Sequence, residues 1–564
     1  MKSNQWQILP AAPEEYQSAS GVPALIAQLL YNRGIKLDEM DLFLTSDDKL
    51  AASPFLLPDI APAVNRVYQA LLSGEKIAVY GDFDVDGITA TVVLVEGLSW
   101  LGAAAVPYLP DRHNEGHGLK LAAMEKLHDQ GIDLIITVDC GVTDHQEVKK
   151  ARKMGMDMII TDHHVPSKIL PRAIAVIDPK RADSDYPFSH LAGVGVAFKF
   201  LQALLYKHPR AGSLNEMLDL VALGTVADMV PLVGENRYLA KEGIKVLNNT
   251  RRVGLQELIS VAGLRPGDIC SQHISWVLAP RINAASRVDS ASTSYKLLVA
   301  QSSEEARSLA RELEQKNIER QHLTDEVMQK VKGRLADRTH LPLLIEGDES
   351  YPLGIIGLAA GRLMEEFRKP AIVLSLGPET CRGSCRSIPE FNIAAALEKY
   401  RKLLITFGGH PLAAGFTLAR QNLPELQEKI MKLAEKQLGH IDLHPALVID
   451  TEVPLSTFDS DTLSMIQKLA PFGQANPVPT FLSRDVEVVE QRSLGNKGKH
   501  LELKIKQGSA VWRAVAFNLA KPQEEIPSHL DVVYNVEKTW WNKEEVLRLN
   551  LLDFAPSQLR QQAL

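Results

Sequence analysis

Cysteine is scarce in this sequence, with four residues in a chain of 564. So few thiols exclude a disulfide-stapled secreted scaffold, because such frameworks need many closely spaced pairs. Cys381 and Cys385 lie four residues apart, but no second cysteine or histidine pair accompanies them. They therefore do not predict a zinc site, which needs a complete set of ligands.

Long apolar runs are also lacking. No stretch of 18 uncharged apolar residues occurs, and the first residues, MKSNQWQILP, lack the basic-then-apolar pattern of a secretory signal. Neither sign of charge is in large excess, because 62 basic and 69 acidic residues give a formal net charge of −7. We therefore expect a soluble, cytoplasmic protein that does not act at a membrane. Any surface that binds nucleic acid must be local.

The most informative stretch is IAVYGDFDVDGITATVVL at residues 77–94. Its apolar start predicts a buried strand of a parallel sheet, followed by three aspartates at alternate positions, Asp82, Asp84 and Asp86. Open α/β sheets bind ligands at the carboxyl ends of their strands. Three carboxylates this close stay ionised together only beside cations, and oxygen ligands suit Mg²⁺ or Mn²⁺. For this stretch alone, a solvated acidic loop is the alternative.

The region from about 75 to 230 alternates strand-like and helix-like segments, which predicts a parallel sheet with right-handed crossovers. We expect strands at 76–80, 105–108, 134–138, 158–161 and 173–177, and helices at 89–100, 119–130 and 144–154. Asp139 and the run Asp162-His163-His164 follow two of these strands, and the apolar segment 218–226 leads to Asp228. Each alone is explained by a helix cap, a turn or a solvated loop. Their recurrence at one edge of a sheet predicts a shared site.

The motifs GDFDVDG, VDCG, TDHH and ALGTVAD, in this order and spacing, resemble the four motifs of the DHH phosphoesterase superfamily. The resemblance is closest to its single-stranded-DNA-specific exonucleases and covers residues from about 20 to 555. It implies catalytic roles for Asp139, His163 and His164, with Asp139 bridging two ions and His164 near the scissile phosphate. The metal ligands that it implies are Asp82, Asp84, Asp86, Asp139, His163 and Asp228. Which aspartate of the first motif binds which ion stays open.

Three segments offer basic or polar residues for a substrate phosphate. Arg112 precedes the segment EGHGL, which resembles a family loop where an aromatic residue is commoner than His117. The expected loop APRINAASR contains Arg281, Asn283 and Arg287, which either bind phosphates or cap helix ends. The family usually has glycine in place of Ser286.

A long helix expected over 304–335 has an apolar stripe that two polar residues interrupt. Asn317 and Arg320 either line a substrate cleft or cap a neighbouring element. The helix itself is predicted to connect two lobes.

A second, smaller α/β unit is expected from about 340 to 440, and it resembles the DHH-associated domain. Alternation along the strand expected at 381–387 places Arg382, Ser384 and Arg386 on one face. These groups suit phosphate oxygens, although exposed strand residues are the ordinary alternative. The resemblance adds His410 as a substrate-binding residue. The segment YPLG at 351–354 replaces the His-Pro-Gly that the family has there.

The last part, about 447–556, has five short segments of alternating apolar residues, which predict a small barrel such as an OB-fold. Lys504 and Lys506 project opposite the apolar series, and Trp512, Trp540 and Trp541 supply flat rings. Cations and stacking rings are typical of single-strand binding, but they also occur on other barrels. The segment PFGQANP at 471–477 is similar to the exonuclease family too.

The sequence thus predicts an α/β protein of five segments. These are an N-terminal helical extension at 1–70, a parallel-sheet DHH catalytic domain at 71–302, a connecting helix at 303–338, a smaller α/β DHH-associated substrate-binding domain at 339–445 and an OB-like β-barrel that binds nucleic acid at 446–564.

The expected activity is hydrolysis of single-stranded DNA with two Mn²⁺ or Mg²⁺ ions. The resemblance alone implies 5′-to-3′ polarity, mononucleotide products, a role in DNA repair and recombination, and a helicase and a single-strand-binding protein as candidate partners. Two alternatives remain. One is a DHH phosphodiesterase of short oligonucleotides or cyclic dinucleotides. The other is a non-catalytic replication scaffold, against which the complete set of ligands argues.

Overall fold

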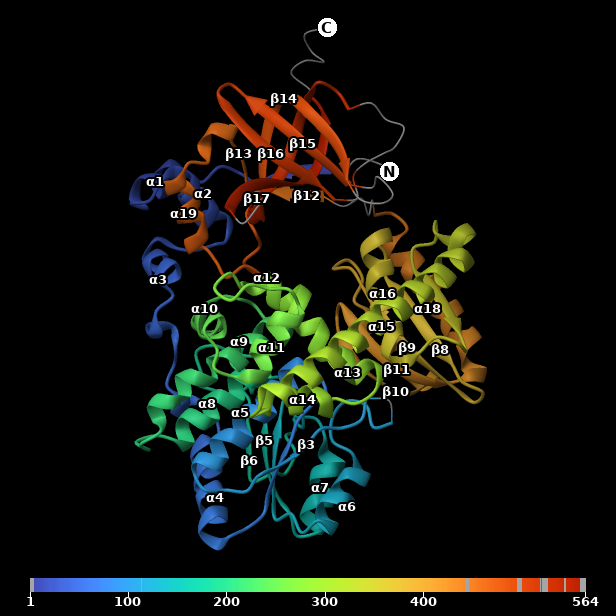
Figure 1. Cartoon of the computed structure of the whole chain (residues 1–564). Helices are drawn as coiled ribbons and strands as arrows, with labels where there is room; N and C mark the ends of the chain where they lie inside the picture. Colours follow the sequence, from blue (N-terminus) through green and yellow to red (C-terminus); the bar gives the residue numbers. More distant parts are fainter. Residues whose placement is uncertain are drawn as a thin grey trace. The chain divides into compact units, whose positions relative to one another are not determined.

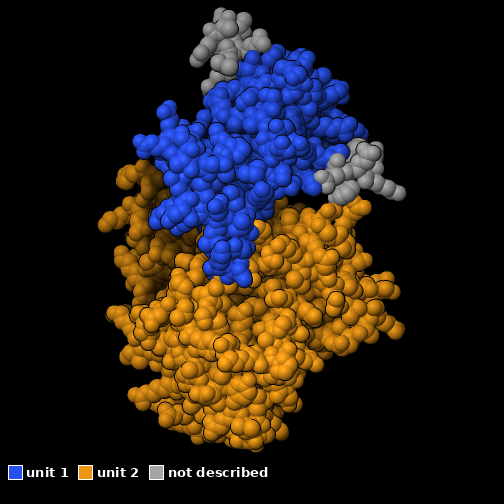
Figure 2. All heavy atoms as spheres, turned by 90° about the vertical axis from the view of Figure 1, so that its left-hand side faces the viewer, with its two compact units in different colours: residues 1–50, 444–564 blue, residues 51–443 orange. Residues whose placement is uncertain are grey.

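The computed structural model describes residues 5–112, 114–441, 446–494, 500–517, 519, 526–541 and 544–557, except for the side chains at 540, 541, 544 and 545. The chain forms two compact units (Figure 2). The large unit is residues 51–443, and the small unit combines residues 1–50 with 444–564. Residues 1–50 thus group with the C-terminal part, whereas the sequence predicted an extension of its own at 1–70. Within the described ranges, no helix is both long enough and apolar enough to cross a bilayer.

A five-stranded parallel sheet lies at the centre of residues 76–225 (Figure 1). Its order is β3 (Val106–Tyr108), β2 (Ile77–Tyr80), β4 (Leu134–Val138), β5 (Asp157–Thr161) and β6 (Ala175–Ile177). The predicted parallel sheet is confirmed. The chain goes to one side of β2 first and to its other side afterwards, so the strand order reverses between β2 and β4. This is the switch point where open α/β sheets bind their ligands.

Alternation along the strands creates a core on each face of this sheet. Ile77 and Val79 of β2 pack with α4 (Ile60–Ser73), α5 (Val85–Trp100) and α8 (Gly193–Leu204). Ala78 and Tyr80, on the other face, pack with α6 (Leu121–Asp129) and α7 (His145–Lys153). Both faces are covered, which explains why β2 and β4 are buried along their whole length.

The middle of the large unit is helical. Its helices are α9 (Leu218–Ala227), α10 (Gly234–Asn248), α11 (Val253–Val261), α12 (Ser271–His273), a π-helical turn (Ile274–Leu278), α13 (Ala279–Val288), α14 (Ser292–Val299) and α15 (Ser303–Leu335). The prediction of a loop at 279–287 is wrong, because this segment forms helix α13. Its proline lies in the first turn, where a missing N–H costs nothing. The apolar segment 218–226 is also helical, and Asp228 is the C-cap of α9.

Helix α15 connects two hydrophobic clusters, as the sequence predicted. Ala306, Ala310 and Leu313 belong to the cluster of the parallel sheet. Val327, Val331 and Leu335 pack instead with α16 (Leu353–Phe367). A second sheet lies beside them, in the order β10 (Leu404–His410), β11 (Ala413–Ala419), β9 (Thr380–Arg386), β8 (Ala371–Leu376) and β7 (Leu344–Asp348). Helices α17 (Ile393–Lys399) and α18 (Leu423–Leu438) pack against this second sheet.

The small unit is built on the predicted five-stranded barrel. Its strands are β14 (Phe481–Leu494), β15 (His500–Gln507), β16 (Ala510–Ala516), β18 (Glu544–Pro556) and β17 (His529–Trp541), and β14 also pairs with β17, which closes the barrel. Strand β13 (Thr451–Glu452) extends β14, and β1 (Gln5–Ile8) pairs with β12 (Ala446–Ile449). Helices α1 (Glu14–Ala19), α2 (Ala24–Asn32), α3 (Met40–Thr45) and α19 (Ser460–Lys468) complete the unit. Ile26 and Leu29 share one core with the barrel, so the N-terminal helices are part of this fold.

Candidate functional site

The three aspartates of the first motif are held differently between β2 and α5. Asp84 is the N-cap of α5. The Asp82 carboxylate accepts the Phe83 amide at 2.7 Å, and its other oxygen lies 2.6 Å from Nδ1 of His117. Burial opposes the ionisation of Asp82, but His117 and the Phe83 amide outweigh it and lower the pKa of Asp82.

Asp86, in the first turn of α5, accepts two backbone amides at the start of α8. The amide of Gly193 donates to one oxygen at 2.6 Å, and that of Val194 donates to the other at 2.8 Å. Burial raises the pKa of Asp86 to about 7, and the charge of Asp84 adds to this effect. The α8 amides therefore fix the orientation of a carboxylate that is costly to ionise.

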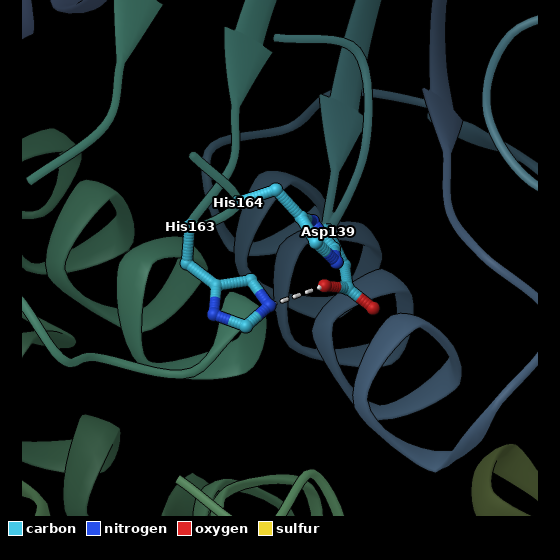
Figure 3. Close-up of side chains that lie close together, drawn as sticks. All are labelled: Asp139, His163 and His164. Atoms are coloured by element: carbon cyan, nitrogen blue, oxygen red, sulfur yellow. Dashed lines mark ion pairs between the residues drawn. The ribbon is translucent and has the colours of Figure 1, made fainter. Parts of the chain in front are cut away.

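Asp139 follows β4 with a left-handed backbone, at a φ of 61°. Asp139 lies so close to α8 that a Cβ atom on Gly193 would approach the Cβ of Asp139 to 2.6 Å. Nε2 of His163 lies 3.0 Å from Oδ1 of Asp139 and 3.6 Å from Oδ2 of Asp228. Figure 3 shows the His163 ring directed at the Asp139 carboxylate. Burial, followed by the charges of Asp86 and Asp84, raises the pKa of Asp139 well above its usual range.

These side chains form three overlapping groups, each with its ligand atoms within 4.8 Å of one another. The groups are Asp82, Asp84 and Asp139; Asp86, His163 and Asp228; and Asp139, His163 and His164. Oδ1 of Asp139 and Nε2 of His163 are buried, and apart from their contact at 3.0 Å neither atom has a hydrogen-bond partner among the described residues. Carboxylate and imidazole donors, and carboxylates that cannot all ionise without a counter-charge, fit divalent Mn²⁺ or Mg²⁺. All six residues predicted as ligands are thus brought together.

Asp162 orients the two histidines, a role that the sequence analysis missed. It accepts the amides of both His163 and His164, and its oxygen lies 2.8 Å from Nδ1 of His164. Burial lowers the pKa of His164, but the hydrogen bond to Asp162 outweighs it and raises this pKa to about 9. The His164 ring stacks with that of His410 from β10, at 6.2 Å between centroids. The available signal was an acidic residue directly before two histidines at a strand end.

Four arginines, each with a pKa that burial lowers, lie beside the acidic groups. Burial lowers the pKa of Arg287, and the charges of Arg112, Arg320 and Arg386 lower it further. Arg112 stacks over Phe83 at 4.7 Å, and Nη1 of Arg287 donates to the Gly354 carbonyl at 3.1 Å. Repelling guanidinium groups that stay together in a protein suit a multiply charged anion.

The other predicted substrate residues of the large unit have mixed placements. Ser384 and Arg386 lie on the predicted face of β9 with Arg382, opposite its buried face. Asn317 is buried, and its amide oxygen accepts from Arg320 at 2.9 Å, so the polar notch of α15 is part of the arginine cluster. Arg281 instead pairs with Glu314 at 2.5 Å, and Asn283 accepts the Val85 amide at 3.1 Å. These last two residues support the site rather than open onto it.

The barrel residues belong to the other unit. Lys504 pairs with Glu490 at 2.8 Å, and Lys506 lies opposite Glu487 in the register of β14 and β15. Trp512 donates its indole N–H to the Leu455 carbonyl at 3.2 Å. The side chains of Trp540 and Trp541 lie outside the described residues. Acidic neighbours thus partly neutralise the positive charge of the expected basic, aromatic face.

The PFGQANP segment joins the barrel to the N-terminal helices. Asn476 is buried, donates to the carbonyls of Leu469 and Pro471, and accepts from Nε of Arg33 at 2.9 Å. Arg33 also donates to the Pro477 carbonyl at 2.7 Å. These contacts lie within the small unit, so the composition of the segment is explained by its role in packing.

Three known domain families match this chain. The DHH family N-terminal domain matches residues 76–225, the DHHA1 domain matches residues 340–436 and the RecJ OB domain matches residues 449–553. The protein therefore has the domain composition of a DHH-family protein with an OB domain.

Single-stranded-DNA-specific exonucleases RecJ match most of the chain. The Bacillus subtilis protein is 36% identical over 98% of this chain and 71% of its own length, and the Dickeya dadantii protein is 32% identical over 90% and 91%. A crystal structure of RecJ from Thermus thermophilus in complex with Mn²⁺ matches with a TM-score of 0.84 at 29% identity, over 98% of this chain and 80% of that one. This chain belongs to the RecJ family, as its motifs predicted.

Proposed function

We propose that this protein is a metal-dependent exonuclease that hydrolyses the phosphodiester bonds of single-stranded DNA. The observation that carries the proposal is the convergence of six metal-type ligands at the switch point of a parallel sheet, beside a cluster of arginines. Its membership of the RecJ family gives the class of substrate.

The proposed ligands of two Mn²⁺ or Mg²⁺ ions are Asp82, Asp84, Asp86, Asp139, His163 and Asp228. Such ions, when bound, lower the pKa of a water molecule and stabilise charge on the phosphate. Asp139 and His163 each belong to two of the three ligand groups, and the family resemblance gives Asp139 the bridging role. Nδ1 of His164 lies 2.8 Å from the Asp162 carboxylate, which leaves Nε2 for the substrate. An N–H at this second nitrogen can donate to a phosphate oxygen.

The arginine cluster, together with Ser384 and His410, is the proposed site for phosphates next to the scissile one. Arg386 and the Ser384 hydroxyl share a face of β9, close to α16, where Ser384 Oγ would lie 3.0 Å from a Cβ on Gly357. A cluster that holds one chain end by its phosphate supports exonuclease action. The 5′-to-3′ polarity and mononucleotide products are part of this proposal.

The barrel is the proposed second contact for long strands. Lys506 is exposed, whereas Lys504 is already paired with Glu490. Replacing Lys506 by Glu should therefore weaken long-strand binding and reduce its dependence on salt, because counterion release falls with each lost cation. An unchanged salt slope would remove Lys506 from the DNA path. The RecJ family membership also supports a setting in cytoplasmic DNA repair and recombination, with a helicase and a single-strand-binding protein as candidate partners.

The test of the function is a digestion with Mn²⁺ of long single strands labelled at either end, beside duplex DNA and a dinucleotide. We expect progressive shortening from the 5′ end, with the duplex spared. Cleavage of the dinucleotide alone would reassign the protein to short substrates, and no Mn²⁺-dependent hydrolysis of any nucleic acid would contradict the proposal.

A further inference from the structure

One continuous helical stretch, residues 271–288, has a less buried side that runs from the candidate site to an exposed tryptophan. It comprises α12, the π-helical turn and α13. Its buried positions include Ile274, Leu278, Ile282 and Ala285. Trp276, Pro280, Asn283 and Arg287 are less buried, and their spacings of four, three and four residues place them along one side of the helix.

The inner end of this side lies within the site. Asn283 accepts the amide of Val85, the first residue of α5. Arg287 belongs to the arginine cluster. Trp276 lies seven residues before Asn283, which corresponds to about 10 Å along a helix. A strand that enters the site along this helix would therefore pass Trp276 within a few nucleotides.

Trp276 is unusually exposed for its residue type, with 76% of its surface accessible. Between Met229 and Ile318, a stretch that the structure describes completely, it is the one exposed large hydrophobic side chain. A single ring does not make an apolar patch of the size that protein partners need. It does match one nucleobase, since every base presents a flat face for stacking. The π-helical turn that carries Trp276 is also a feature found frequently at functional sites.

Helix α9, which carries the candidate ligand Asp228 as its C-cap, also contacts the π-helical turn. The residue after Asp228, Met229, has a left-handed φ of 58° and is 70% exposed. Two exposed apolar side chains thus project from the elements that carry Asp228 and Asn283.

We propose that Trp276 is a stacking platform for a nucleobase of the substrate strand, a few nucleotides away from the scissile bond. The inference rests on the proposed function and adds a subsite that contacts a base rather than a phosphate. It predicts tolerance of every base but a requirement for a base at one position, because stacking reads no hydrogen-bond pattern.

The test uses the full-length protein with Trp276→Ala, Trp276→Phe and the control Tyr206→Ala. Tyr206 is 60% exposed and lies beyond the far end of α8, about 18 Å from the Gly193 end. We expect Trp276→Ala to raise the KM for a long single strand about tenfold, the effect of one lost stacking contact, with little change in kcat. Trp276→Phe and Tyr206→Ala should stay close to the parent protein. Hydrolysis of a dinucleotide should not change in any variant.

A scan of strands with one abasic nucleotide at successive positions locates the subsite. In the parent protein, an abasic nucleotide at one position should raise the KM about as much as Trp276→Ala does on an intact strand. On the strand with that abasic position, the parent and Trp276→Ala should have equal KM values. Equal KM values for the parent and Trp276→Ala on intact strands would overturn the inference, and so would a loss that Trp276→Phe shares in full. Failure of the parent protein to degrade single strands would instead contradict the proposed function, so the two failures are distinguishable.

Discussion

Asp139 combines constraints that few residues carry together. Its backbone is left-handed, its carboxylate is buried, and it belongs to two of the three ligand groups. Asparagine tolerates this backbone conformation at least as well as aspartate, so an amide can replace the carboxylate without a change of shape. The charge alone is then removed.

Asp139→Asn should lower turnover by a factor on the order of 10³ or more, because residues that act as one catalytic unit fail together. Binding of single strands should remain measurable, since the arginine cluster is untouched. Turnover of end-labelled strands with Mn²⁺ and filter binding check the two expectations. Unchanged turnover would refute the assignment of the site.

Divalent cations should stabilise the folded protein, because they relieve the repulsion that raises the pKa values of Asp86, Asp139 and Asp228. An ion present at about 100 times its Kd adds about 2.7 kcal/mol to the free energy of unfolding. We expect Mn²⁺ to raise the Tm of the parent by several degrees and a chelator to reverse the shift.

Asp228→Asn provides the matched variant for this cation effect. Without metal, it should be at least as stable as the parent, since one repelling charge is gone, and its Tm should respond less to Mn²⁺. Calorimetry with and without Mn²⁺ measures both. A full Mn²⁺ response in Asp228→Asn would exclude Asp228 as a ligand.

The sequence indicated the candidate ligands only as a set, because acidic residues and histidines recur after several apolar segments, and the resemblance named the individual residues. The supporting contacts could not be predicted. The pairing of Arg281 with Glu314, and the contact of Asn283 with Val85, join residues 33 and 198 positions apart. Such contacts depend on the packing of α13 against α15 and α5, which no local pattern encodes.

At the level of elements, α13 shows how composition can mislead. Proline, asparagine and small residues indicate a loop, yet proline suits a first helical turn and alanine favours the helix interior. Ser286 is buried in this helix, and its hydroxyl donates to the Asn283 carbonyl at 3.2 Å. The helix therefore does not need the glycine that is usual at this position in the family.

Ser286→Gly should lower the free energy of unfolding by about 0.5 kcal/mol, because glycine is only that much worse than serine inside a helix, and leave turnover within about twofold of the parent. Urea denaturation and a turnover assay measure the two. Ser308→Gly, at an exposed position inside α15, is the control for helix propensity alone. A large loss of turnover in Ser286→Gly would mean that the hydroxyl contributes to the site.

The loop at 471–477 shows the converse limit of sequence analysis. Its motif was recognisable, but its partner Arg33 lies more than 400 residues away. The Arg33 side chain is 3% exposed and also lies 3.4 Å from the buried carboxylate of Asp450. The motif predicted an important segment without revealing that its contacts hold the small unit together.

Arg33→Ala should destabilise the small unit by about 3 kcal/mol, because it removes the cation beside the buried Asp450 carboxylate and leaves the Asn476 amide oxygen buried without its partner. The Asp450 carboxylate keeps its hydrogen bonds to Asn32 and Thr480. Limited proteolysis should then cut within residues 1–50 well before it cuts the large unit. Lys36→Ala, at an exposed position three residues further on, should behave like the parent. Equal protease resistance of Arg33→Ala and the parent would contradict this account.

At the scale of the whole molecule, the first and last parts of the chain fold together. Strand β1 pairs with β12, and residues of α2 and α3 share a hydrophobic cluster with the barrel. From the sequence, the barrel could be predicted from its alternating strands. The association of the N-terminal helices with it could not, since an amphipathic helix does not specify which surface it covers.

This architecture makes two shortened chains behave differently. A chain of residues 1–443 retains Ile26, Leu29 and Phe43 without the barrel that buries them, so it should bind a hydrophobic dye and aggregate. A chain of residues 51–443 omits these residues and should remain monodisperse, with Mn²⁺-dependent hydrolysis of short oligonucleotides. Its degradation of long strands should fall about tenfold or more, because a second binding contact on the same strand raises the effective concentration of substrate. Size-exclusion chromatography and digestion of short and long strands measure these effects. If residues 51–443 degraded long strands as well as the full chain does, the barrel would lie outside the DNA path.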